Sequence, residues 1–95
     1  MKTIYRYQIP FLGQPIKAPI DPTEPIKEQI LKVDIIRGEP SIWILCDTDF
    51  PEREINIRVY GTGFSMERVH TKENYLGSFI IGESEIYHCF LDEGD

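Results

Sequence analysis

Two apolar runs joined by a turn decide the fold of this chain: QILKVDIIR at residues 29–37 and SIWILCD at residues 41–47, with GEP between them. In the first run apolar and polar side chains largely alternate, which is typical of a β-strand with one buried face. The Gly38-Glu39-Pro40 segment predicts the turn of a hairpin. Residues 42–46 are apolar at every position, which predicts a central strand covered on both faces. We expect the cover to be another sheet, the N-terminal segment or a second subunit.

The same alternation continues at both ends of the chain. Residues 3–9 place Tyr5, Tyr7 and Ile9 on one face, and Pro10 ends this strand because it has no N–H to donate. Further strands are predicted at residues 55–60, 75–81 and 85–91, the last two as a hairpin around the turn at residues 82–84.

The segments between these strands are rich in proline or charge. Residues 11–25 fit only an edge strand at 16–18, followed by a helical turn at 25–28 that proline can begin. Residues 47–54 predict a polar loop in which Glu52 and Glu54 share a face. The sequence thus predicts a single β domain over residues 1–95, an all-β fold that forms a small antiparallel sandwich or partly closed barrel of about six strands.

The composition excludes several classes of function. The chain has 95 residues and a formal net charge of −6, which argues against binding a nucleic acid polymer, because that requires cations to neutralise phosphates. No segment has the ~18 consecutive apolar residues of a membrane helix. Cys46 and Cys89 each lie within an apolar run, which predicts buried free thiols. We therefore expect a cytoplasmic protein without a membrane partner.

The best candidate site is the segment Arg58-Val59-Tyr60-Gly61-Thr62-Gly63. A strand here runs into two glycines, and the backbone N–H groups of such a turn can form a nest for an anion, with the Thr62 hydroxyl as a further donor. Arg58 shares a face with Tyr60 and could bind phosphate. Tyr60, with Tyr5 or Tyr7, could stack on a nucleobase. The alternative is that Gly61, Thr62 and Gly63 form only a turn that ends the strand.

The remaining polar residues do not form a catalytic or metal-binding pattern. His70 is predicted to be a solvent-exposed loop residue and His88 a hydrogen-bonded residue within a strand, and their spacing fits no metal site. No serine or cysteine lies in a nucleophile motif. We therefore expect no enzyme, no metal and no cofactor.

Three segments resemble a family of short bacteriophage and prophage proteins with a YGTG(H) motif. They are residues 1–7, the hairpin residues 30–33 with Trp43 and Cys46-Asp47, and the C-terminal set 58–63, 75–78 and 87–90. The family usually has histidine where this chain has Phe64, and tryptophan where it has Tyr87. The resemblance implies a phage accessory protein, and chemistry that depended on that histidine would be absent.

These observations lead to three hypotheses. The first is a small non-enzymatic accessory protein that acts against a host process by sequestering a small nucleotide-like ligand at the interface of a homo-oligomer. The second is a protein-interaction module that inhibits a host enzyme through an acidic, aromatic surface. The third is a structural or assembly factor of the virion.

Overall fold

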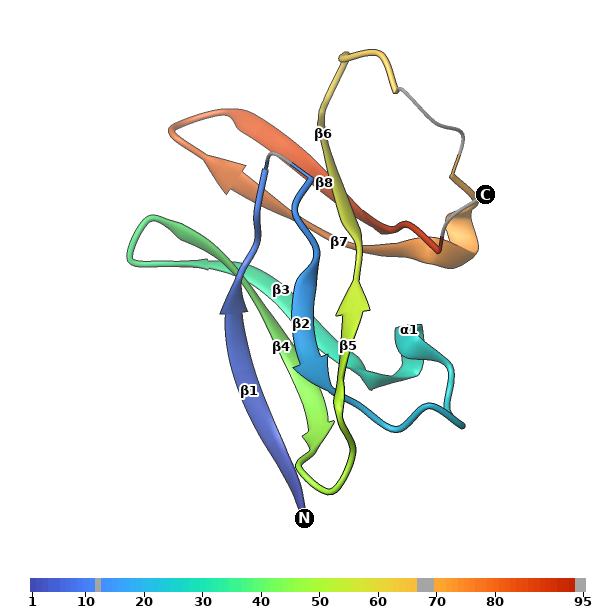
Figure 1. The fold of residues 1–95 in the computed structure, drawn as a ribbon. Coiled ribbons are helices and arrows are strands. Elements are labelled where there is room, and N and C mark those ends of the chain that lie inside the picture. Colours follow the sequence, from blue (N-terminus) through green and yellow to red (C-terminus); the bar gives the residue numbers. More distant parts are fainter. Residues whose placement is uncertain (12, 67–69, 94–95) are drawn as a thin grey trace.

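The fold is built from short antiparallel strands. The computed structural model describes residues 1–11, 13–66 and 70–93, and these residues form eight strands, one short α-helix and one 3-10 turn (Figure 1). In chain order they are β1 (Lys2–Gln8), β2 (Ile16–Pro19), α1 (Ile26–Gln29), β3 (Ile30–Ile36), β4 (Glu39–Asp47), β5 (Glu52–Ile55), β6 (Ile57–Gly61), η1 (Lys72–Asn74), β7 (Tyr75–Ile81) and β8 (Glu85–Leu91). The predicted all-β antiparallel fold is confirmed, with three small sheets and no closed barrel among the described residues.

The first sheet, called sheet A, has the strand order β1-β4-β3. The predicted hairpin forms, but its turn is at Arg37-Gly38, and Glu39 already belongs to β4, where it pairs with Ile36. Arg37 and Gly38 have φ values of 52° and 80°, as a two-residue hairpin loop of the I′ type requires. The prediction of a Gly38-Glu39-Pro40 turn was therefore wrong, because the twist of the strands favours the shorter loop.

The second sheet, sheet B, consists of β2 and β5. The prediction of a polar loop over residues 47–54 was wrong in its second half, because residues 52–55 pair with β2. Ile55 faces Ile16 and is buried, while Glu54 lies opposite Lys17. Glu52 and Glu54 do share an exposed face, but it is the face of a strand.

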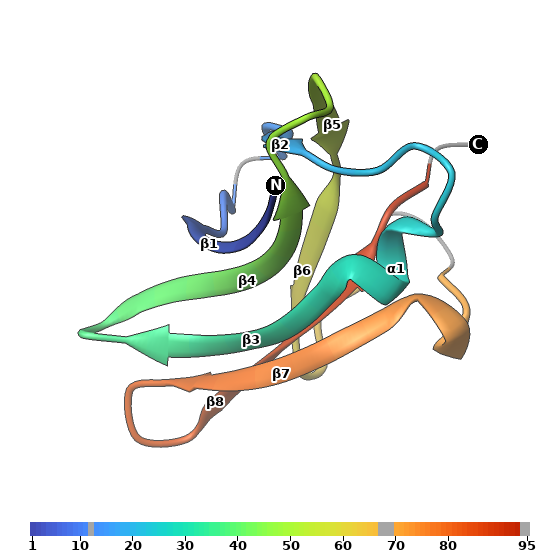
Figure 2. The same cartoon turned by 90° about the horizontal axis from the view of Figure 1, so that it is seen from below.

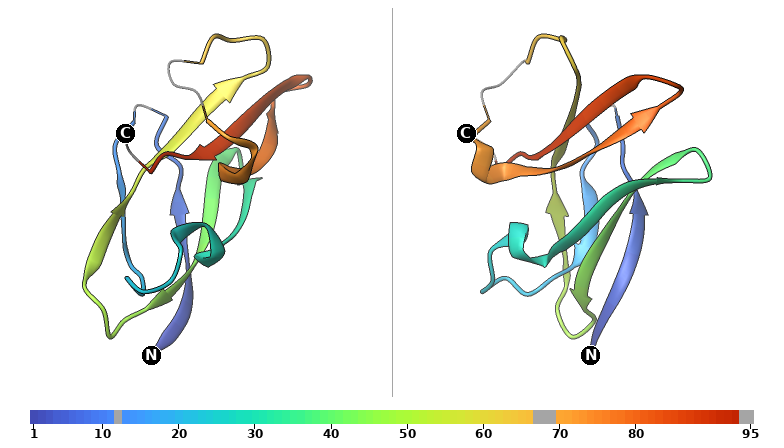
Figure 3. Two further views of the ribbon diagram at one scale, coloured as in Figure 1. Left: turned by 90° about the vertical axis from the view of Figure 1, so that its right-hand side faces the viewer. Right: turned by 180° about the vertical axis from the view of Figure 1, so that it is seen from behind.

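The third sheet, sheet C, has the strand order β6-β8-β7, and its β7–β8 hairpin turns at residues 82–84 as predicted. Only Asn56 separates β5 from β6, so one bent segment connects sheets B and C (Figure 1). Sheets A and C adjoin where β3 runs beside β7 (Figure 2). The tips of the β3–β4 and β7–β8 hairpins lie on the same side of the molecule (Figure 3).

The core lies between the three sheets and contains side chains from each of them. Its buried apolar members are Ile9, Ile16, Ala18, Ile20, Val33, Ile42, Ile44, Cys46, Ile55, Ile57, Phe79, Cys89 and Leu91. Both cysteines are buried and free, as predicted, and burial raises the pKa of Cys89 from 9.0 to about 12.

Strand β4 is central in sheet A, as the apolar run predicted. Ile42, Ile44 and Cys46 are buried on its inner face, whereas Trp43 and Leu45 on the outer face are half-buried. The expectation that β4 is covered on both faces therefore holds only for the inner face within this chain. The N-terminal strand β1 pairs beside β4 rather than lying over it.

Candidate functional site

The Gly61–Gly63 segment forms the turn that ends β6. The Phe64 N–H donates to the Gly61 carbonyl at 3.0 Å, and the Thr62 N–H donates to the Ile86 carbonyl of β8 at 3.0 Å. A turn at this position is what the simpler of the two interpretations predicted. Two amides that could have faced an anion are thus directed at carbonyl groups of the protein.

Four ring side chains from three strands gather on one face of sheet C. Alternation along β6 and β8 places Tyr60, His88 and Phe90 on this face, and the register pairs Tyr60 with His88 and Tyr75 with Phe90. We call this the outer face of sheet C, because the buried Cys89 points the opposite way, into the core. Sequence alternation within each strand could have identified these rings, but their grouping depends on the register between strands.

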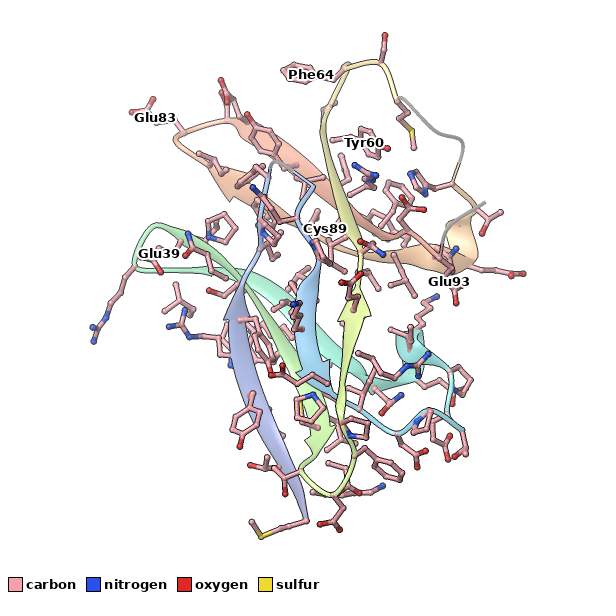
Figure 4. All side chains as sticks on the ribbon, in the orientation of Figure 1. Glu39, Tyr60, Phe64, Glu83, Cys89 and Glu93 are labelled. Carbon is pink, nitrogen blue, oxygen red and sulfur yellow. The ribbon has the colours of Figure 1, made fainter. Side chains whose placement is uncertain are left out.

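An open hollow of about 260 Å³ lies on this face, and we call it the aromatic groove. Figure 4 shows Tyr60 beside β6 and Phe64 at the turn that follows. Phe64 and Met66 stand at the rim and are exposed. The side chains that line the groove include those of Tyr60, Thr62, Phe64, Tyr75, His88 and Phe90.

A directed chain of hydrogen bonds crosses the groove through His88. The Thr62 hydroxyl donates its single hydrogen to the Ile86 carbonyl at 3.0 Å, so the contact of 3.0 Å between Thr62 Oγ1 and His88 Nε2 needs the hydrogen of the imidazole. With the ring hydrogen on Nε2, Nδ1 is left as an acceptor, and the Tyr75 hydroxyl at 3.0 Å donates to it. The prediction that His88 is a hydrogen-bonded strand residue is confirmed.

His70 forms a second tyrosine–histidine pair. Its Nε2 lies 2.9 Å from the Tyr60 hydroxyl, and its ring stacks on Phe90 with a centroid distance of 5.2 Å and an interplanar angle of 19°. The prediction of a solvent-exposed loop residue was wrong, because the rings of the outer face hold this imidazole in a half-buried position. The charged sequence around His70 gave no signal of this contact.

Arg58 is held by an ion pair at the edge of the outer face. Its Nε donates to Asp92 Oδ2 at 2.9 Å, and Asp92 is only 6% exposed. The Arg58 guanidinium also lies against Gly13, where an added Cβ would be 3.0 Å from Nη1. A carboxylate therefore already engages the side chain that was predicted to bind phosphate.

Tyr5 and Tyr7 lie on sheet A and do not join the groove. They pair with Ile44 and Ile42 of β4, and the Tyr7 hydroxyl lies 3.9 Å from Cys46 Sγ. Burial and this contact raise the pKa of Tyr7. Of the predicted site residues, the structure brings Tyr60 and the turn residues 61–63 together at the groove. The two N-terminal tyrosines lie on sheet A instead.

Several exposed acidic side chains lie in the segments that form and flank sheet C. Glu83 lies at the tip of the β7–β8 hairpin and Glu93 beyond the end of β8 (Figure 4). Glu73 in η1 and Glu85 at the start of β8 are also exposed, although alternation along β8 places Glu85 on the opposite face from Ile86, where it accepts a hydrogen bond of 3.0 Å from the Tyr87 hydroxyl. With a net charge of −6, these carboxylates predict a negative electrostatic potential around sheet C.

Within the part of the chain that the structure describes, no three histidine, cysteine, aspartate or glutamate residues are placed to hold a metal ion. In the same part, no helix is long and apolar enough to cross a membrane. The groove itself presents aromatic faces and hydrogen-bonding oxygen and nitrogen atoms to a ligand.

Comparison with known proteins assigns the chain to a family. Neither the curated proteins nor the solved structures include one that matches this chain. The match is to a protein family, it covers residues 1–95, and the chain therefore belongs to the DUF7352 family, a domain of unknown function.

Proposed function

We propose that this protein is a non-enzymatic protein-interaction module that binds a basic partner through the outer face of sheet C. The observation that carries the proposal is that the aromatic groove continues into exposed apolar side chains. Ile80 and Ile86 are cross-strand neighbours on this face and are 56% and 40% exposed, and Phe64 at the rim is 68% exposed. An apolar surface of this kind, surrounded by polar side chains, is typical of a protein interface.

The size of the groove supports a protein partner over a free nucleotide. Small-molecule sites usually enclose about 300–1,000 Å³ and bury most of their ligand, whereas the groove measures about 260 Å³ and lies open at the surface. One protruding side chain of a partner fits this space better than a base, sugar and phosphate together. The flatter surface around Ile80 and Ile86 would then form the rest of the contact.

The charge of the surface supports a basic partner. The chain carries a net charge of −6, and the exposed carboxylates Glu73, Glu83, Glu85 and Glu93 lie in the segments that form and flank sheet C. Charges of opposite sign accelerate association and select the orientation of the complex. In the accessory role that the sequence resemblance implies, the partner is a host enzyme with a basic surface.

Sequestration of a nucleotide-like ligand is the second candidate. The rings of Tyr60 and Phe90, with centroids 6.1 Å apart, favour it because aromatic faces stack on nucleobases. This function requires a homo-oligomer, since a second copy would have to close the open groove. A nucleotide released from the purified protein by heating would support this candidate and contradict the first.

Two matched substitutions test the interaction module. Ile86→Lys places a cation on the outer face of sheet C, and Ile4→Lys makes the same change at an even more exposed isoleucine of β1 in sheet A, 56% against 40%. In affinity capture from host lysate, we expect Ile86→Lys to lose a stoichiometric partner that the native protein and Ile4→Lys retain, and capture to weaken at high ionic strength. Equal capture by both variants would contradict the proposal.

A further inference from the structure

We propose that the aromatic groove binds the guanidinium group of an arginine side chain on the partner. This inference rests on the proposed interaction function and specifies the group that enters the groove. It follows from the direction of the hydrogen bonds at Thr62, Tyr75 and His88 and from the ring faces around them.

The hydroxyl groups of the groove are left as acceptors. The Thr62 hydrogen is directed at the Ile86 carbonyl, and His88 Nε2–H donates to Thr62 Oγ1. The Tyr75 hydrogen is directed at His88 Nδ1. Each hydroxyl oxygen has two lone pairs, so one lone pair of Thr62 and both of Tyr75 can accept hydrogen bonds from a ligand. The groove therefore favours a group that brings several N–H donors.

The rings favour a flat cation. The face of an aromatic ring carries negative charge, and arginine is the side chain that most often stacks on such a face. Tyr60 and Tyr75 flank Phe90, with centroid distances of 6.1 Å and 5.2 Å to its ring. Because His70 already stacks on Phe90, the two tyrosines supply the ring faces for the ligand. A guanidinium group is planar and has five N–H donors in fixed directions, so it can stack on a ring and donate to both hydroxyl oxygens.

The same features disfavour a lysine or an anion. An ammonium group is compact and strongly hydrated and cannot stack. An anion would meet lone pairs at Thr62 and Tyr75, and the Thr62 and Phe64 amides donate to carbonyl groups of the protein. Arg58, a cation on this face, is paired with Asp92.

The test uses two peptides of equal charge, Gly-Arg-Gly-Arg-Gly amide and Gly-Lys-Gly-Lys-Gly amide, titrated into the full chain and followed by amide chemical shifts. We expect the arginine peptide to shift the signals of Thr62, Tyr75 and His88 and to bind about fivefold more tightly than the lysine peptide. Inorganic phosphate should leave these signals unchanged.

Variants then test the acceptor oxygens. Thr62→Val and Tyr75→Phe remove one hydroxyl each and keep most of the side-chain volume, and each should weaken the arginine peptide about fivefold without changing the lysine peptide. Tyr5→Phe makes the same change on sheet A and should have no effect on either peptide. Urea unfolding curves identify any variant whose fold is lost, and the comparison of the two peptides on the native chain does not depend on the variants.

Three results would overturn the inference. Equal affinity for the two peptides would show that charge alone is recognised, and the proposed interaction function would stand without the arginine. Shifts confined to the acidic hollow lined by Asp21, Glu24 and Asp47 would place the cation elsewhere. Failure of both peptides to bind would contradict the inference and the proposed function together.

Discussion

Replacing Gly77 by alanine should strongly destabilise the protein, because Gly77 lies where β7 packs against β3 and sheets A and C meet. Its φ is 142°, a conformation that residues with a side chain rarely adopt, and an added Cβ would lie 2.7 Å from Val33 Cγ2. The backbone strain costs about 1–3 kcal/mol, and overpacking in a core costs about 1–3 kcal/mol more. Together these contributions give a loss of about 2–6 kcal/mol, a large part of the roughly 5–15 kcal/mol that stabilises a small domain.

Urea unfolding followed by the fluorescence of Trp43 measures this loss. Two comparisons separate its parts. Gly82 also has a positive φ, 71°, but no atom lies within 4 Å of an added Cβ, so Gly82→Ala should cost only the backbone strain. In a Val33→Ala background the clash is removed, and Gly77→Ala should cost about 1–3 kcal/mol. A loss below about 0.5 kcal/mol for Gly77→Ala, within the range of ordinary surface changes, would refute the packing of β3 against β7.

Three further predictions concern buried polar groups. Asp92→Asn should lower the free energy of unfolding by about 2 kcal/mol in urea titrations. Breaking a fully buried ion pair costs about 3–5 kcal/mol, and the loss is smaller here because the Arg58 side chain is 36% exposed. Burial raises the pKa of the Cys89 thiol from 9.0 in the unfolded chain to about 12 in the folded protein. The free energy of unfolding should therefore fall as pH rises between these values, by up to about 1.4 kcal/mol per pH unit. Cys89→Ala should flatten that slope, and an unchanged slope would contradict the burial of the thiol. The two Nε2 hydrogens of Gln29 are shared among three carbonyls, and its Oε1 accepts from the Asp21 N–H. Gln29→Glu should therefore cost about 2–3 kcal/mol at neutral pH, with partial recovery in acid, and equal stability of the two proteins would contradict this role.

Much of the fold could be predicted because its signals are local. The alternation in residues 29–37 and the uninterrupted apolar run at 42–46 identify the first hairpin, and a turn at 82–84 identifies the second. Strand β5 was missed because Glu52, Arg53 and Glu54 are polar, and its strand partner β2 is distant in the sequence. A short edge strand with one exposed face resembles a loop until its partner is known.

The candidate site could be predicted only in part, for the same reason. The turn at residues 61–63 is a local feature and was identified. The ion pair of Arg58 with Asp92 and the contact of Tyr75 with His88 join residues that are 34 and 13 positions apart. Such contacts are set by the register of β6, β7 and β8, which the sequence of any one strand does not contain.

The most direct test of the account is the tautomer of His88, because the acceptor character of the groove depends on it. The ¹⁵N chemical shifts of the imidazole, measured in the native chain near neutral pH, distinguish a protonated Nε2 from a protonated Nδ1. The hydrogen bonds from Tyr75 and to Thr62 predict a hydrogen on Nε2 and none on Nδ1. A hydrogen on Nδ1 instead would reverse the chain, make Tyr75 an acceptor from the ring, and contradict the proposed recognition of a guanidinium group.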